Sequence, residues 1–338
     1  LTESRVIWHG TGGRYPEGPH IYKKDGWYYL LISEGGTELA HKLTIARSKN
    51  IYGPYTANPD NPIFTHCCRA GQTSQIQGTG HGDFVQATDG SWWLVFLAYR
   101  QYGGAYHHLG RETFLTPVEW KTNEWPVING GQPVDTLMKV KTPPAVPVRT
   151  PAHHYDFNDE KFDCEWVHIQ NPINEYYRFR DGRLILRTSG STLSDNKQPT
   201  FIGQRQTNAV MTVETEVEML AGELGSEAGL SAYQIFDGHA EIALKHNGAR
   251  YVPVMKVRVK SLEIEKEGEP QTSPKILLRL RSDSERYYFE YAPEGGDFKT
   301  IDSIECSLLS TEVVGGFTGV TVGIYTTGTA AFEYFKYD

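Results

Sequence analysis

Short apolar runs rich in aromatic residues fill the first part of the chain, and turn residues separate them. One run covers Trp27–Ile32 and returns as Trp92–Ala98, and an Asp-Gly pair stands before each of them, at Asp25-Gly26 and Asp89-Gly90. Short apolar runs bounded by turn residues and rich in aromatic residues are consistent with buried strands, and Asp-Gly is a frequent hairpin turn. The pattern predicts two antiparallel hairpins built on one repeating unit of 64 residues.

The same offset aligns two ionisable residues, Glu17 before the first hairpin and His81 before the second. Repeats that contain several short strands are typical of β-propeller blades, whose equivalent strands meet around one axis. We therefore expect Glu17 and His81 to occupy equivalent positions in two blades and to face that axis.

The chain is predicted to contain two β domains joined by a proline-rich linker. Residues 1–145 carry the repeat, 146–154 form the linker, and 155–338 show further alternating runs such as Val210–Val217 and Val252–Val259. Many short strands without an amphipathic helix favour a β-sandwich for the second domain. Propellers typically have about four to eight blades, so the first domain is expected to be the C-terminal part of a larger propeller.

Composition argues against nucleic acid and membrane partners. The chain has 41 acidic and 33 basic residues, a net charge of -8 and no basic run, which makes it a poor candidate for binding nucleic acid or an anionic membrane. No stretch reaches the roughly 18 apolar residues of a membrane span. The cysteines lack the spacing of a zinc site. The 20 Tyr, 14 Phe and 7 Trp are compatible with strand packing and with stacking on sugar rings.

Glu17 is the leading candidate for a general acid. Glycoside hydrolysis needs a protonated carboxyl group beside the leaving oxygen and a second carboxylate, and aromatic surroundings raise the pKa of a Glu towards that task. The alternative is a strand Glu that faces solvent. His81 could hold a metal ion or water, or bond a carboxylate, or be an ordinary polar residue. Arg111 could hold vicinal sugar hydroxyls or a carboxylate, or form a salt bridge with Glu112 or with a neighbouring strand.

Three segments together resemble glycoside hydrolase family 43, in particular its two-domain β-xylosidases and α-L-arabinofuranosidases. They are Glu17-Gly18-Pro19-His20, Gly80-His81-Gly82-Asp83-Phe84-Val85 and Leu109-Gly110-Arg111-Glu112-Thr113. The resemblance implies an all-β fold, with part of a five-bladed β-propeller followed by a C-terminal β-sandwich. It implies inverting hydrolysis with Glu17 as general acid and with Arg111 and His81 in the substrate site. It also implies that Phe317 lies in a sandwich segment that narrows the mouth of the pocket.

The base of this family and the Asp that orients its acid have no matching motif in this chain. The resemblance therefore implies an N-terminal fragment of the same protein as a partner, and a chain that is inactive alone. The expected substrate is the terminal α-L-arabinofuranosyl side chain of arabinoxylan, with β-xylosidase activity on xylo-oligosaccharides as the alternative. A non-catalytic carbohydrate-binding fragment and a purely structural β protein stay open.

The remaining expectations concern cofactors and location. The resemblance implies that no cofactor is required. A structural calcium ion in the sandwich, held by Asp156 and Glu333, is a further expectation from the layout of the family. The protein is expected to be secreted.

Overall fold

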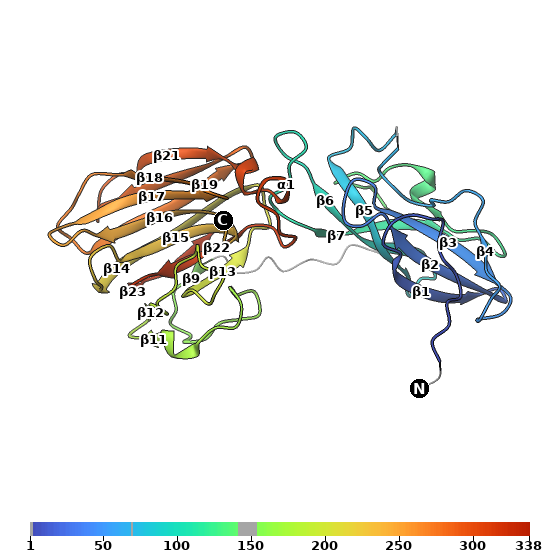
Figure 1. The fold of residues 1–338 in the computed structure, drawn as a ribbon, viewed down its shortest axis with the longest axis horizontal. Coiled ribbons are helices and arrows are strands. Elements are labelled where there is room, and N and C mark those ends of the chain that lie inside the picture. Colours follow the sequence, from blue (N-terminus) through green and yellow to red (C-terminus); the bar gives the residue numbers. More distant parts are fainter. Residues whose placement is uncertain (1–2, 69, 141–153) are drawn as a thin grey trace. The chain divides into compact units, whose positions relative to one another are not determined.

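The computed structural model describes residues 3–68, 70–140 and 154–338. Strands dominate these residues, which confirms the prediction of an all-β protein, and no helix among them is long and apolar enough to cross a bilayer. The chain divides into two compact units (Figure 1). The first comprises Leu1–Gln101 and Arg111–Val148, and the second comprises Tyr102–Gly110 and Arg149–Asp338. Most of the predicted linker, 146–154, lies outside the described residues.

The first unit contains two four-stranded antiparallel sheets, each with the strand order of one propeller blade. Their orders are β1-β2-β3-β4 and β5-β6-β7-β8. The strand bounds are β1 Glu17–Lys24, β2 Trp27–Glu34, β3 Lys42–Ser48, β4 Thr56–Ala57, β5 Ile76–Gln86, β6 Trp92–Arg100, β7 Glu112–Glu119 and β8 Val127–Ile128, followed by the 3-10 turn η1 Asn129–Gly131. Both predicted hairpins are present, as β1-β2 and β5-β6.

Aromatic side chains from both sheets form the core of the first unit. The Trp120 ring, just after β7, lies 4.9 Å from the Tyr29 ring and 5.2 Å from the Phe84 ring, measured between centroids. Tyr29 lies on β2 and Phe84 on β5, and both side chains are buried. Contacts of this kind stabilise the packing beyond the burial of apolar area alone. The core therefore ties the two sheets together.

The first strands of the two sheets carry the same register shift. It falls between Glu17 and His20 in β1, and between Gly80 and Asp83 in β5. Glu17 pairs with Ser33 and Gly80 pairs with Leu97, so the second strands match at an offset of 64 residues while the first strands match at 63. Counted between equivalent paired residues, the connection from β5 to β6 is one residue longer than the connection from β1 to β2, and this produces the difference in offset.

The expected equivalence of Glu17 and His81 is therefore wrong by one residue. The counterpart of Glu17 is Gly80, and the counterpart of His81 is Gly18. The backbone agrees, because Gly18 has φ of 55° and His81 has φ of 45°. A side chain in this left-handed region costs roughly 1–2 kcal/mol, which Gly18 avoids and His81 does not.

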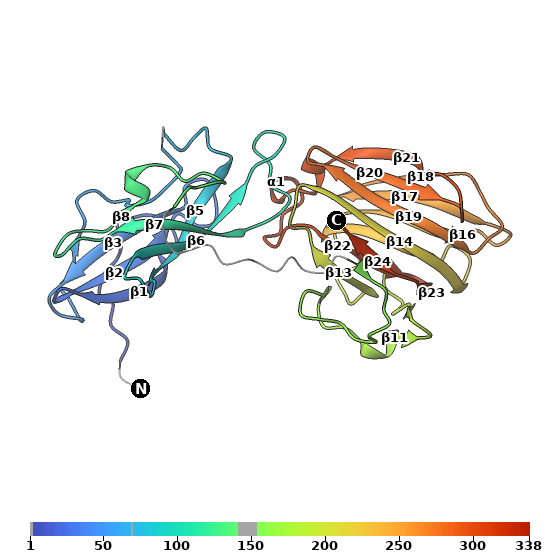
Figure 2. The same ribbon diagram turned by 180° about the vertical axis from the view of Figure 1, so that it is seen from behind.

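The second unit is a sandwich of two antiparallel sheets, seen from opposite sides in Figures 1 and 2. The orders are β10-β13-β22-β15-β16-β17-β18 and β11-β12-β23-β14-β19-β20-β21, with β9 and β24 attached to the second sheet. The bounds are β9 His154–Tyr155, β10 Val167–His168, η2 Asn174–Tyr176, β11 Tyr177–Arg180, β12 Arg183–Arg187, β13 Phe201–Arg205, β14 Val210–Ala221, β15 Glu227–Ile235, β16 Gly238–His246, β17 Tyr251–Val259, β18 Leu262–Glu267, β19 Lys275–Asp283, β20 Arg286–Ala292, β21 Lys299–Glu305, η3 Cys306–Leu309, α1 Thr311–Val314, β22 Thr321–Thr326, β23 Thr329–Phe332 and β24 Phe335–Tyr337. The main core lies between the sheets.

The segment Tyr102–Gly110, which connects β6 to β7, packs as part of the second unit. Glu312 of α1 holds it, because its Oε1 lies 2.5 Å from His107 Nδ1 and its Oε2 accepts the His107 N–H at 3.0 Å. The Val320 N–H donates to the His108 carbonyl at 2.8 Å. Nothing in the local sequence of this segment predicts that it belongs with the sandwich.

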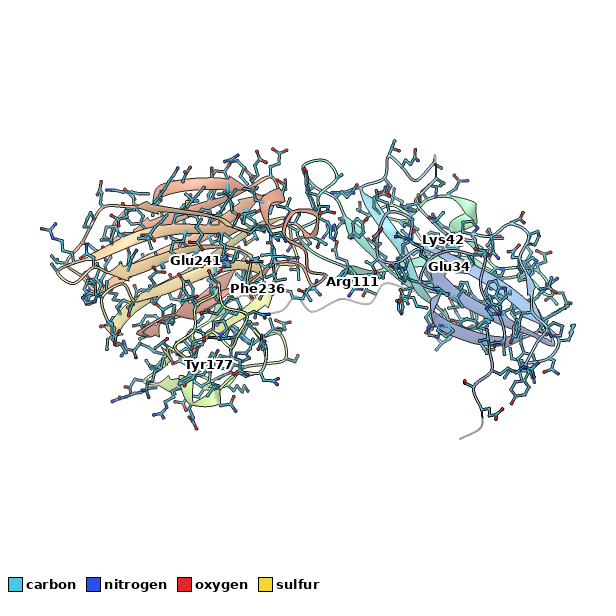
Figure 3. All side chains as sticks on the ribbon, viewed as in Figure 1. Glu34, Lys42, Arg111, Tyr177, Phe236 and Glu241 are labelled. Atoms are coloured by element: carbon cyan, nitrogen blue, oxygen red, sulfur yellow. The ribbon has the colours of Figure 1, made fainter. Side chains whose placement is uncertain are left out.

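Buried Glu34 fastens the residues before β1 to the first sheet. It is fully buried at the end of β2 (Figure 3) and accepts hydrogen bonds from Thr11 N at 3.0 Å, Gly13 N at 3.0 Å and Thr44 Oγ1 at 2.7 Å. Burial alone would raise the pKa of Glu34, but these hydrogen bonds outweigh it and hold the pKa below its ordinary value.

Replacing Glu34 by Ala should destabilise the first unit by about 3 kcal/mol, because donors of Thr11, Gly13 and Thr44 lose a buried charged acceptor at once. Urea unfolding followed by tryptophan fluorescence measures this. The matched control is Glu38→Ala, which removes an exposed pair with Arg14 at 3.0 Å and should change the free energy of unfolding by less than about 1 kcal/mol. Equal effects of the two substitutions would contradict the role assigned to Glu34.

Candidate functional site

Glu17 and His81 lie together across the two sheets of the first unit. Glu17 begins β1, His81 lies in β5, and Glu17 Oε1 is 3.5 Å from His81 Nδ1. Their side chains are 42% and 47% exposed, so both are open to a ligand. The His81 N–H donates to Ser33 Oγ on β2, which links β5 to the first sheet directly. Two residues predicted separately for the site thus form one pair.

A reciprocal pair lies beside the first. Asp83 of β5 has its Oδ1 3.6 Å from His20 Nδ1 of β1, and it also accepts a hydrogen bond from the Tyr22 hydroxyl. Tyr22 Oη in turn accepts the Phe84 N–H at 2.9 Å. Burial, and then the bond to Asp83, raises the pKa of Tyr22. Each first strand therefore gives one acid and one His to the other strand, an arrangement that the sequence alone did not predict.

His41 is buried close to Glu17 and His81, and the sequence did not predict it as part of this site. Its Nδ1 lies 2.9 Å from the Gly78 carbonyl oxygen, and its Nε2 is buried without a hydrogen-bond partner among the described residues. A Cβ on Gly80 would lie 2.4 Å from the His41 ring, so only glycine lets β5 cross the ring this closely. Nothing in the sequence around Gly80 or His41 predicts that these two residues are in contact.

The pKa of His41 is affected by the charged groups around it. Burial is the main cause that lowers the pKa of His41, and the positive charges of His81 and Arg111 act in the same direction. The Gly78 carbonyl and the Glu17 carboxylate oppose them. His41 is therefore a neutral imidazole near neutral pH. Glu17, His81 and Arg111 are all close enough to act on this one ring.

Arg111 stands immediately before β7 and is exposed (Figure 3). The carboxylate of the next residue, Glu112, accepts hydrogen bonds from Arg100 at 2.8, 3.0 and 3.2 Å. Glu112 thus has Arg100 as a partner, and the role of Arg111 stays a prediction.

Phe317 lies in the second unit, between α1 and β22, and is 57% exposed. Glu17, His81 and Arg111 all belong to the first unit. The predicted place of Phe317 at the mouth of the pocket stays a prediction.

The residues expected to hold calcium, Asp156 and Glu333, have other polar partners in this structure. Glu333 lies 3.5 Å from Arg183 and 3.7 Å from Lys275, and Asp156 accepts the Asn158 N–H at 3.2 Å. Across residues 3–68, 70–140 and 154–338, no group of three or more His, Cys, Asp or Glu could hold a metal ion. Calcium binding stays a prediction, and no chemical step below depends on a metal.

Comparison with family models matches both units of the chain. Residues 2–126 match the model described as glycosyl hydrolases family 43. Residues 154–338 match the model described as the beta xylosidase C-terminal concanavalin A-like domain.

Similar proteins include ones named as an arabinofuranosidase and a xylosidase. The non-reducing end alpha-L-arabinofuranosidase BoGH43B of Bacteroides ovatus is 33% identical over 98% of this chain and 64% of its own length. The beta-xylosidase of Bacillus subtilis is 29% identical over 100% of this chain and 68% of its own. The solved structure of the Bacteroides ovatus xyloglucan PUL GH43B has a TM-score of 0.92 at 31% identity, covering 99% of this chain and 68% of that one. The chain thus spans about two thirds of the length of these relatives.

The depressed pKa of His41 predicts a loss of stability in acid. The unfolded chain takes up a proton at His41 at a higher pH than the folded chain does. Stability is therefore complete above the unfolded pKa of about 6.5 and falls as the pH drops from there towards the folded pKa, by at most about 1.4 kcal/mol per pH unit for one group.

The check is urea unfolding between pH 7 and pH 5 of the parent chain and of His41→Gln, which cannot titrate. His66 and His168 also have pKa values lowered mainly by burial, so the parent slope contains their share, and the His41→Gln slope should be smaller but not zero. The exposed His9→Gln is the matched control and should keep the parent slope. Identical slopes for all three proteins would contradict a neutral buried His41.

Proposed function

This chain belongs to glycoside hydrolase family 43, and we propose that it is part of an inverting exo-glycosidase that removes terminal α-L-arabinofuranosyl groups from arabinoxylan. The observation that carries the proposal is the position of the Glu17 carboxylate, half-exposed and 3.5 Å from His81, with Arg111 near enough to act on the same buried ring. An acid, a polar neighbour and a cation on one exposed surface are what binding and protonating a glycoside require.

Glu17 protonates the oxygen of the leaving group in this proposal. The bond between the anomeric carbon and that oxygen breaks as the proton moves from the carboxyl group to the oxygen, and the departing chain leaves as a neutral alcohol. A water oxygen bonds to the anomeric carbon from the opposite face and gives its proton to the second carboxylate. His81 lies on the Glu17 carboxylate and positions it. The left-handed backbone at His81 directs the ring towards β1, and a strained residue of this kind is typical of functional sites.

Arg111 binds the terminal sugar in this proposal. A guanidinium group has several donors in a fixed plane, which suits two adjacent hydroxyl oxygens at once. The neighbouring Glu112 is held by Arg100 through three close contacts, so its carboxylate has a cation of its own.

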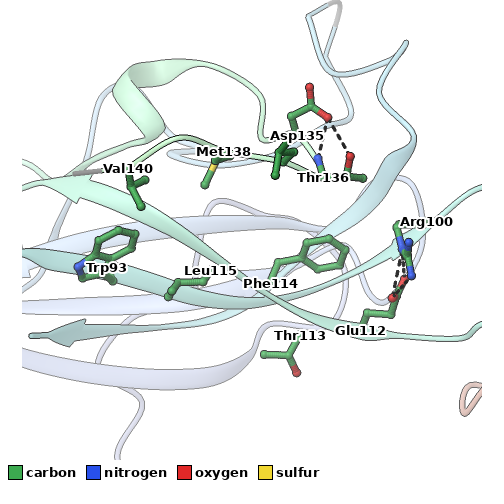
Figure 4. A pocket seen from close by; sticks show the side chains of 11 residues that line it. Trp93, Arg100, Glu112, Thr113, Phe114, Leu115, Asp135, Thr136, Met138 and Val140 are labelled. Carbon is green, nitrogen blue, oxygen red and sulfur yellow. Dashed lines mark hydrogen bonds and ion pairs between the residues drawn. The ribbon is translucent and has the colours of Figure 1, made fainter. Parts of the chain in front are cut away.

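The carboxylate that activates water lies on a separate N-terminal segment of the protein in this proposal. The relatives are about half as long again as this chain, which leaves room for such a segment. The outer face of the β5-β8 sheet supports a further partner, because Val85, Val95 and Leu115 are 47%, 37% and 48% exposed there. A hollow of about 470 Å³ on this sheet is lined by Trp93, Phe114, Leu115 and Met138 (Figure 4). An apolar strip of this kind marks a packing surface.

Arabinofuranosidase activity is proposed over β-xylosidase activity because the Bacteroides ovatus relative named above is an arabinofuranosidase. The second candidate is β-xylosidase activity, which the name of the Bacillus subtilis relative favours. Initial rates on 4-nitrophenyl α-L-arabinofuranoside and 4-nitrophenyl β-D-xylopyranoside separate the two activities.

Glu17→Gln should lower kcat on arabinoxylan oligosaccharides by about 10²–10⁴-fold, because the leaving alcohol then lacks its proton donor. The loss should be much smaller on the 4-nitrophenyl glycoside, since nitrophenolate leaves without a proton. The assay uses the protein with its N-terminal segment, and the control is Glu119→Gln, an exposed residue on β7. An equal loss on both substrates would overturn the acid role. Binding of oligosaccharides by the parent protein without cleavage would overturn the enzyme in favour of a carbohydrate-binding protein.

A further inference from the structure

A cluster of buried charged side chains lies in the second unit, apart from Glu17, His81 and Arg111. His239 and Glu241 are on β16, and Glu227 is on β15, and they are 4%, 3% and 4% exposed. Their neighbours Ala240 and Ile242 point into the main core, so by strand alternation His239 and Glu241 occupy the other face of the seven-stranded sheet. Figure 3 labels Glu241 on this sheet.

The members of the cluster are joined by short polar contacts. Glu241 Oε1 lies 2.7 Å from His239 Nδ1, and Glu241 Oε2 accepts the Tyr325 hydroxyl at 2.8 Å. Lys256 Nζ lies 2.9 Å from Glu227 Oε2 and 3.8 Å from Glu241 Oε2. Ser194, on the chain before β13, has its Oγ 3.2 Å from His239 Nε2. Five elements of the unit therefore converge on one polar cluster.

This cluster lines a cavity of about 200 Å³. Its walls are formed by Ser194, His239, Glu241, Lys256, Val257, Arg258, Glu263, Ile264 and Glu265. At about 30 Å³ for each water molecule, the space equals roughly six or seven waters, which is the scale of a single sugar ring. The cavity is thus too small for a polymer chain but sufficient for one terminal sugar.

Stability does not account for the cluster. Buried ion pairs are often no more stabilising than apolar residues of the same volume, because each charge loses its hydration. Three buried polar atoms in or beside the cluster also have no hydrogen-bond partner among the described residues, and these are His239 Nδ1, Ser231 Oγ and Arg258 Nε. Ser231 pairs in register with Glu241, so this hydroxyl lies next to the cluster. Polar groups left unsatisfied at a cavity are typical of a site that a ligand completes.

We propose that this cavity binds a neutral, polyhydroxylated ligand the size of one sugar ring. Its walls carry carboxylates at Glu241, Glu263 and Glu265 and basic groups at Lys256 and Arg258. Glu263 pairs with Arg258, Glu265 with Lys245 and Lys256 with Glu227, so a ligand would use the lone pairs and N–H groups that these contacts leave open. A sugar hydroxyl is both donor and acceptor. An anion would meet the three carboxylates, and a cation would meet the two basic side chains. A sugar satisfies both sets without adding charge.

The Ser194-His239-Glu241 order resembles that of a hydrolytic triad, but the geometry favours binding. A triad needs the carboxylate to accept the N–H of His Nδ1. Here His239 Nδ1 is close to Glu241 at 2.7 Å but is not aligned with it as a hydrogen bond. Binding uses Ser194 and Lys256 as hydrogen-bond donors and requires no such alignment.

The test is ligand-observed saturation-transfer NMR of the chain with D-xylose, L-arabinose and D-glucose, each titrated through the millimolar range. It is done in a Glu17→Gln, Arg111→Ala background, so that the site proposed in the first unit does not contribute. At least one sugar should bind saturably. Lys256→Met and Ser194→Ala should each weaken that binding about tenfold, the effect of one lost hydrogen bond of about 1.4 kcal/mol.

Lys266→Met is the matched control, because Lys266 is an exposed lysine on β18 that pairs with Asp302, and its sugar affinity should equal that of the background. A thermal unfolding transition shows that each variant is folded. If Lys256→Met is not folded, Ser194→Ala is the variant that tests the proposal. No saturable binding of any of the three sugars would overturn the proposal. Unchanged affinity in the folded variants would also overturn it. Neither result bears on Glu17, so the proposed glycosidase stands or falls separately.

Discussion

The site in the first unit depends on one constraint, the matching register shift at the start of β1 and β5. It puts a left-handed residue at Gly18 and at His81, and it brings the two strands close enough for reciprocal pairs, Glu17 with His81 and Asp83 with His20. Gly80 then lies directly on the buried His41 ring. A larger residue at Gly80 would push β5 away from that ring and would separate Glu17 from His81.

Much of the fold could be predicted from local patterns, because alternation and Asp-Gly turns are local signals. The hairpins β1-β2 and β5-β6 and the strands of the sandwich follow from them. The prediction that Glu17 and His81 occupy equivalent positions was wrong, because a single sequence offset does not account for a turn that is longer by one residue. The residues are close because they are neighbours across two sheets, and not because they are equivalent.

The rest depends on contacts between residues far apart in the sequence. From the sequence Glu34 is an ordinary strand residue, and only the structure shows that Thr11 and Gly13 donate hydrogen bonds to it. From the sequence His107 belongs to a loop between two strands of the first unit. In the structure its contact with Glu312 holds it in the second unit. The alternation of β16 puts His239 and Glu241 on one face, but it does not reveal that Lys256 and Ser194 meet them there.

The central claim is that Glu17 is an acid whose water-activating partner lies on a separate N-terminal segment. The most direct measurement is the rate of L-arabinose release from arabinoxylan oligosaccharides by this chain alone and by the chain mixed with that segment. The account predicts no release above the level of Glu17→Gln for the chain alone, and release of the inverted anomer when the segment is added. Release by the chain alone, or a retained anomer from the mixture, would contradict it.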